Sequence, residues 1–206
     1  YQWFTAGRKE AQAFFEKLTA DHHAEKTILW KPYYRNPVAM TKYRTGVASM
    51  MGLPLIQSVA DMPQLNELCK TCQIHLIIYC NPDVMTIRKE TGNLSNITFL
   101  TEEECREADV DLYELLVFTD ALLTDFSEIS LDYLLLDRPV GYILEDYAEF
   151  EQANGFIFDD PHAYMPGEQI YQKADLEQFF RHVVYGEDAY GEKRKEVCEK
   201  THQVTD

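Results

Sequence analysis

The stretch Ala121-Leu122-Leu123-Thr124-Asp125-Phe126-Ser127-Glu128-Ile129-Ser130-Leu131-Asp132-Tyr133 decides the fold, because it predicts a strand, a sharp turn and a helix in succession. Its first three residues form an apolar run of strand length, which ends in polar Thr124 and Asp125. We expect Asp125 to cap the helix, since Glu128 three residues later completes a capping-box pattern. The N–H groups at such a junction bind phosphate well, although a purely structural cap gives the same pattern.

Apolar runs alternate with helical patterns along the rest of the chain. The predicted strands are Thr27–Trp30, Gln73–Cys80, Asn96–Leu100, Ala121–Leu123 and Pro139–Leu144. The segment Tyr147–Ala153 is expected to be a helix or a loop. The predicted helices are Phe4–Leu18, Asp61–Cys72, Val110–Thr119, Asp175–Tyr185 and Tyr190–Gln203. The last of these is charged and has few apolar positions, so we expect it to pack against a part of the protein outside this chain. The alternation predicts an α/β fold, a Rossmann-like parallel sheet flanked by helices.

Polar residues follow several of the predicted strands. Ligands of parallel sheets bind at the carboxyl ends of the strands, near the point where the strand order reverses. The residues expected at this edge are Arg35, Asn81, Thr101, Thr124 to Ser127, and Asp146. Of these, Arg35 either pairs with a phosphate group or is an ordinary surface arginine.

Composition limits the classes of protein and partner. The chain has 206 residues, 46% of them hydrophobic, which is typical of a globular domain. Its formal net charge of −16 argues against binding to nucleic acid or to an anionic membrane surface. A phosphate ligand would therefore depend on local N–H groups and a few cations. No apolar run approaches the roughly 20 residues needed to span a bilayer.

The cysteines favour free thiols in a reducing cytoplasm over a disulfide framework, because the chain has an odd number of them, five. A zinc site formed by Cys69, Cys72, His75 and Cys80 is a weaker alternative. Two of these residues fall at a helix end and two in a buried strand, so their side chains are poorly placed to surround one zinc ion tetrahedrally. We predict neither a metal ion nor a cofactor.

Several segments resemble the signature "TDYSS…FDY…kRP" of the CDP-glycerol glycerophosphotransferases, which polymerise teichoic acids. The matching residues are Thr124-Asp125-Phe126-Ser127, Leu131-Asp132-Tyr133 and Arg138-Pro139. The similarity continues in the same order through Asp146-Tyr147, Gly155-Phe156-Ile157-Phe158-Asp159 and Pro166-Gly167. Upstream, the segment from Ile28 to Arg35 is similar to the family segment "ILYAPTfR".

The resemblance implies a GT-B type fold with two Rossmann-like domains, and the matching motifs belong to its C-terminal half. Residues 1–206 are thus expected to form a single donor-nucleotide-binding domain of a larger protein whose N-terminal half is absent. The implied activity transfers glycerol phosphate, or a related polyol phosphate, from a CDP-activated donor to a cell-wall or surface polysaccharide at the cytoplasmic face of the membrane. The acceptor would bind through the missing half. The substrate-binding residues carried over are Arg35, Thr124, Asp125, Ser127, Glu128, Asp132 and Asp146.

Three departures from the family pattern leave a second interpretation open. Asn81 stands where the family has a histidine, and an amide cannot transfer protons near neutral pH. Glu128 replaces the second serine of the signature, and Asn154 replaces an arginine. The chain is therefore expected to be either a divergent transferase, with this donor or another nucleotide-activated sugar, or a non-catalytic binding or scaffolding module.

Overall fold

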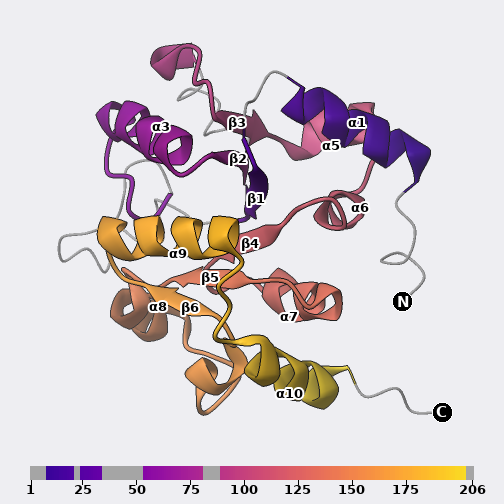
Figure 1. The fold of residues 1–206 in the computed structure, drawn as a ribbon. Coiled ribbons are helices and arrows are strands. Elements are labelled where there is room, and N and C mark those ends of the chain that lie inside the picture. Colours follow the sequence, from indigo (N-terminus) through magenta and orange to yellow (C-terminus); the bar gives the residue numbers. More distant parts are fainter. Residues whose placement is uncertain (1–7, 21–23, 34–52, 81–88, 203–206) are drawn as a thin grey trace.

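The computed structural model describes residues 8–20, 24–33, 53–80 and 89–202 of the chain. They contain one six-stranded sheet with the order β3-β2-β1-β4-β5-β6, in which every neighbouring pair is parallel (Figure 1). The strands are β1 (Lys26–Trp30), β2 (Ile74–Tyr79), β3 (Ile97–Leu100), β4 (Ala121–Thr124), β5 (Val140–Ile143) and β6 (Glu168–Ile170). The predicted α/β class and parallel sheet are confirmed.

Helices flank the sheet on both sides. They are α1 (Lys9–Thr19), α3 (Met62–Thr71), α5 (Glu102–Glu107), α6 (Leu112–Leu116), α7 (Ile129–Tyr133), α8 (Tyr147–Asn154), α9 (Lys173–Tyr185) and α10 (Gly191–Thr201). Single 3-10 turns occur at η2 (Val59–Asp61), η4 (Leu134–Leu136) and η5 (Pro161–Tyr164). A capping box formed by Thr101 and Glu104 starts α5.

Alternate residues of each central strand face opposite sides of the sheet, as strand geometry requires. On one side Ile28 and Trp30 of β1 pack with apolar residues of α3 and α9. On the other side Leu29 packs with apolar residues of α1, α6, α7 and α10. Both faces of the sheet are thus buried, which explains why its strands are continuous apolar runs.

Two features of the C-terminal part differ from the prediction. Strand β6 was not predicted, because it has only three residues and two of them are polar. Helix α10 was expected to pack outside this chain, but it contacts η4, with Val197 3% exposed and Arg194 2% exposed. Arg194 forms ion pairs with Asp188 and Asp137, so a charged residue of α10 anchors the helix to the domain.

The strand order reverses between β1 and β4. Strands β2 and β3 lie on one side of β1, and β4, β5 and β6 lie on the other. Trp30 of β1 pairs with Leu123 of β4, so the loops that follow these strands leave the sheet side by side. This reversal is the topological switch point at which parallel sheets place their ligands.

Candidate functional site

Hydrogen bonds join the ends of β1 and β4 at the switch point. The Thr124 hydroxyl donates to the carbonyl oxygen of Lys31 at 2.7 Å, and the Lys31 N–H donates to the carbonyl oxygen of Leu123 at 2.8 Å. Thr124 is completely buried. The first residue of the predicted turn therefore fixes the backbone of the neighbouring loop.

Asp125 extends this connection. Its Oδ1 atom accepts hydrogen bonds from the N–H groups of Tyr33 and Phe126, each at 2.8 Å, and the residue is 1% exposed. The prediction that Asp125 caps the following helix is wrong. Helix α7 begins at Ile129, and Glu128, the residue before it, makes no side-chain capping bond. The Asp125 side chain does not cap the helix because its Oδ1 atom is already bonded to the N–H groups of Tyr33, after β1, and of Phe126.

Ser127 and Glu128 lie beyond these bonds, at the surface. Ser127 is partly exposed and Glu128 is exposed. The Ser127 carbonyl oxygen accepts from the N–H and the hydroxyl of Ser130, which closes the turn. Among the described residues, the N–H groups of Ser127 and Glu128 have no hydrogen-bond acceptor. Two backbone donors therefore remain available at the carboxyl end of the sheet.

Aromatic contacts bring the separate motif segments together. Phe126 of the turn stacks on Phe150 of α8, with ring centroids 4.0 Å apart, and Tyr33 after β1 meets the same ring edge-on at 5.2 Å. Tyr147 stacks on Phe156 at 5.0 Å, and Phe156 lies 5.6 Å from Phe126. The loops after β1, β4 and β5 and the segment after α8 thus form one cluster.

The remaining acidic residues of the predicted site lie around this cluster. Asp146 is buried after β5, and its carbonyl oxygen accepts from the N–H of Phe150 at 2.9 Å in the first turn of α8. Asp132 on α7 accepts a hydrogen bond from the Tyr113 hydroxyl at 2.9 Å. Their assignment as substrate-binding residues stays a prediction, as does that of Thr124, Asp125, Ser127 and Glu128.

Sequence reasoning did not single out Lys31, which follows β1 directly. Its ammonium group lies 5.5 Å from the centroid of the Tyr79 ring and donates to the carbonyl oxygen of Pro32 at 3.3 Å. Burial lowers the pKa of the ammonium group, and the nearby carboxylates of Asp125 and Glu128 partly oppose that shift. The signal in the sequence was a cation at the first position after a strand.

Lys31 lines a cavity of about 810 Å³ beside the carboxyl ends of β1 and β2. Tyr79 and Tyr113 contribute phenol rings to it. Burial raises the pKa of each phenol to about 12; the hydrogen bond from Tyr113 to Asp132 adds to its shift. Both hydroxyls therefore stay protonated near neutral pH. The acidic and basic residues around them are Arg8, Glu102, Arg106, Asp109, Asp111 and Glu114.

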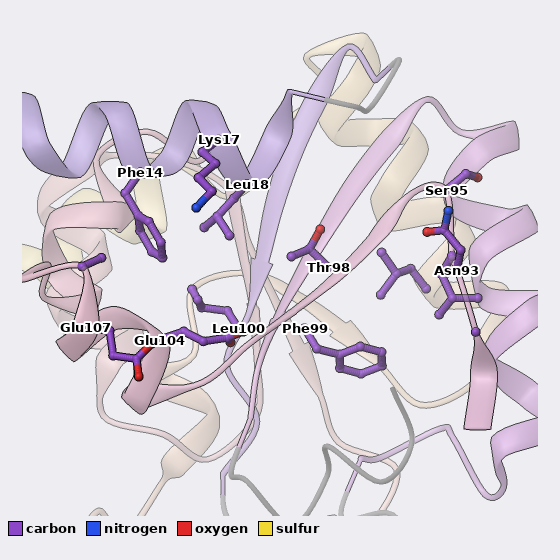
Figure 2. Close-up of a pocket in the computed structure, with 14 residues that line it drawn as sticks. Phe14, Lys17, Leu18, Asn93, Ser95, Thr98, Phe99, Leu100, Glu104 and Glu107 are labelled. Atoms are coloured by element: carbon purple, nitrogen blue, oxygen red, sulfur yellow. The ribbon is translucent and has the colours of Figure 1, made fainter. Parts of the chain in front are cut away.

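A second cavity, of about 860 Å³, lies at the edge strand β3 (Figure 2). Phe14, Lys17 and Leu18 of α1 project into it toward Leu100 of β3 and Glu104 of α5. Strand β2 separates β3 from the switch point, and none of the predicted site residues lines this cavity. The cavity beside β1 and β2 is also lined by none of them, but Lys31 lines it and its carbonyl oxygen is bonded to Thr124. We therefore assign the candidate site to the switch point, with this cavity beside it.

Two predicted residues, Arg35 and Asn81, lie outside the described residues. All five cysteines are free, as expected from their odd number. Within the described ranges, no group of three or more residues could hold a metal ion. No helix there is long and apolar enough to cross a membrane.

Comparison with known proteins adds to this geometry. The family CDP-glycerol:poly(glycerophosphate) glycerophosphotransferase matches residues 3–206. No curated protein sequence matches the chain. Among solved structures, a variant of the wall teichoic acid polymerase TagF is similar with a TM-score of 0.68 and 16% identity, covering 99% of this chain and 46% of the polymerase chain.

Another TagF structure is similar with a TM-score of 0.64 and 17% identity over 92% of this chain and 41% of TagF. A TagF variant soaked with CDPG has a TM-score of 0.61 and 17% identity over 92% of this chain and 40% of TagF. The chain thus spans less than half of these polymerase chains. At such identities the likeness establishes the fold.

Proposed function

Because the chain belongs to the CDP-glycerol:poly(glycerophosphate) glycerophosphotransferase family, we propose that it forms the donor-binding half of a transferase. The donor is a CDP-activated glycerol phosphate or a related polyol phosphate, and the acceptor is a cell-wall or surface polysaccharide. The acceptor hydroxyl oxygen attacks the phosphorus of the polyol phosphate, the bond to the CMP phosphate breaks, and CMP leaves. The hydroxyl proton passes to a general base.

The observation that carries this proposal is the meeting of the motif segments at the switch point. Thr124 to Glu128, Tyr147 and Phe156 are separated in sequence but converge through one aromatic cluster. The N–H groups of Ser127 and Glu128 supply neutral donors for the donor's phosphates, which suits a chain with a net charge of −16. A TagF variant was soaked with CDPG, which supports the choice of nucleotide.

Calorimetry with CDP-glycerol, CDP, CMP and UDP tests the donor. We expect the cytidine diphosphates to bind more tightly than UDP, and the isolated chain to bind donor without transferring glycerol phosphate, since the acceptor site belongs to the other half. Absence of binding at millimolar concentrations, or equal binding of every anion, would contradict a cytidine-nucleotide site. Rapid transfer of glycerol phosphate by the isolated chain would contradict the proposal that donor and acceptor bind to different halves of the protein.

A non-catalytic binding module is the second candidate, and Asn81 is the observation that favours it. If the family's histidine position is Asn81 and the site is otherwise intact, Asn81→His in the full-length protein should raise turnover by about 10²–10⁴-fold. Donor binding without turnover in both proteins would support the module. Turnover with a nucleotide sugar but not with CDP-glycerol would instead indicate a different donor.

A further inference from the structure

We infer that Lys31 is the cation that binds the phosphate groups of the donor at the switch point, where it offsets the negative charge of Glu128. This inference rests on the proposed function and deepens it, since it names a specificity-determining residue. Lys31 stands at the alanine position of the family segment "ILYAPTfR".

The position of Lys31 is fixed by its backbone. Its N–H and C=O groups are both hydrogen-bonded to β4, to Leu123 at 2.8 Å and to Thr124 at 2.7 Å. The side chain leaves this fixed point toward the Tyr79 ring on β2 and lines the adjoining cavity. The two backbone hydrogen bonds fix the start of the side chain beside β4, and the contact with the Tyr79 ring shows the direction in which the ammonium group points.

Lys31 also differs from the other cations of the cavity. Arg8 forms ion pairs with Asp109 and Glu114, and Arg106 lies 3.7 Å from Glu103. Lys31 forms no ion pair within the part of the chain that the structure describes. Its positive charge is thus available to a ligand, whereas the charges of Arg8 and Arg106 are already paired with carboxylates.

The charges around Lys31 explain why an acidic residue is tolerated in the turn. Asp125 and Glu128 both act electrostatically on the ammonium group, although neither approaches it as an ion pair. A carboxylate at the position of Glu128 repels an incoming diphosphate unless a cation lies close by. Lys31 follows β1 directly and its carbonyl oxygen is bonded to Thr124, four residues before Glu128. We therefore expect Lys31 to compensate for the exchange of serine for Glu128.

The test is calorimetry of CDP-glycerol and of uncharged cytidine with Lys31→Met, Lys31→Arg and Glu128→Ser. We expect Lys31→Met to weaken CDP-glycerol binding at least 10-fold and to leave cytidine binding unchanged. Lys31→Arg should stay within a few-fold of the wild type, because it keeps the charge. Glu128→Ser should restore part of the affinity that Lys31→Met loses. If Lys31→Met does not fold, Lys31→Gln replaces it.

Two control variants remove the same charges elsewhere. The variants are Lys26→Met and Glu192→Ser. Lys26 lies at the opposite end of β1, where its side chain pairs with Asp120, and Glu192 lies on α10 with a 98% exposed side chain. Neither should change CDP-glycerol affinity beyond two-fold. Wild-type affinity in Lys31→Met would overturn the inference and leave the proposed function standing.

Failure of the wild type to bind CDP-glycerol would count against the proposed function instead. In that case inorganic pyrophosphate is titrated against the same variants. Binding that depends on Lys31 would support a phosphate site formed by this residue. Equal binding to the wild type and Lys31→Met, or no binding to either, would overturn the inference.

Discussion

Thr124-Asp125 and Ser127-Glu128 are two pairs in one turn with opposite surroundings. Thr124 and Asp125 are 0% and 1% exposed, and their side chains hold the loop after β1 through two hydrogen bonds, to main-chain groups of Lys31 and Tyr33. Asp125 also accepts from the Phe126 N–H within the turn. Ser127 and Glu128 lie at the surface with N–H groups that have no acceptor among the described residues. Polar groups of the first pair are satisfied within the protein, and those of the second are open to a ligand.

This difference separates two ways in which a polar motif can serve a binding site. A buried, bonded residue contributes to stability and sets the positions of the loops. An exposed residue with open donors contributes to affinity and has little effect on folding. Substitutions in the two pairs should therefore affect different measurements.

Asp125→Ala should have the largest effect on stability. Two N–H groups in part-buried hydrogen bonds would lose a charged acceptor, so we expect the free energy of unfolding to fall by about 3 kcal/mol. Urea unfolding measures this directly, with Asp125→Asn as a matched variant that keeps one carbonyl oxygen and loses less. A loss below about 1 kcal/mol would show that the N–H groups of Tyr33 and Phe126 find other acceptors.

Thr124→Val should have a smaller effect of the same kind. The substitution keeps the shape of the side chain and removes the hydroxyl that donates to the Lys31 carbonyl oxygen at 2.7 Å. We expect a loss of about 1–2 kcal/mol in the free energy of unfolding, and Thr124→Ser should recover part of it. If Thr124 also contacts the donor, as the family resemblance implies, calorimetry will show weaker binding to the folded variant. Unchanged stability would show that the side-chain hydrogen bond of Thr124 does not stabilise the fold.

The sequence predicted the five longer strands because each is an apolar run bounded by polar residues. It did not predict β6, whose place depends on a close approach between Gly167, the residue before β6, and Val140 of β5. A Cβ atom at Gly167 would lie 2.0 Å from the Val140 carbonyl oxygen, so only glycine allows β6 to lie beside β5. Such an approach is a property of the folded sheet, and three residues of mixed polarity give no periodicity that reveals it.

The sequence predicted which end of the strands carries the candidate site, but not the contacts between its residues. The carboxyl ends of the strands follow from the alternation of strands and helices, so Thr124 to Ser127 and Asp146 could be located in advance. The hydrogen bond from the Tyr33 N–H to Asp125 joins residues that are 92 positions apart, so a capping rule based on neighbouring residues could not predict it. The role proposed for Lys31 depends on Tyr79 and Glu128, which lie on two other segments. Sequence spacing carries no information on these contacts.

Ser127→Ala should have the smallest effect and test the second pair most directly. The substitution removes the hydroxyl and keeps the backbone N–H groups, so donor affinity should fall by about 1 kcal/mol if the hydroxyl meets a phosphate. The free energy of unfolding should change by less than about 0.5 kcal/mol, because the residue is partly exposed and the turn is closed by its carbonyl oxygen. Ser95→Ala, at the amino end of the edge strand β3, is the control for affinity and should leave it unchanged. A stability loss without an affinity loss would place Ser127 with Thr124 and Asp125, and the open N–H groups would then be the only contribution of the turn to phosphate binding.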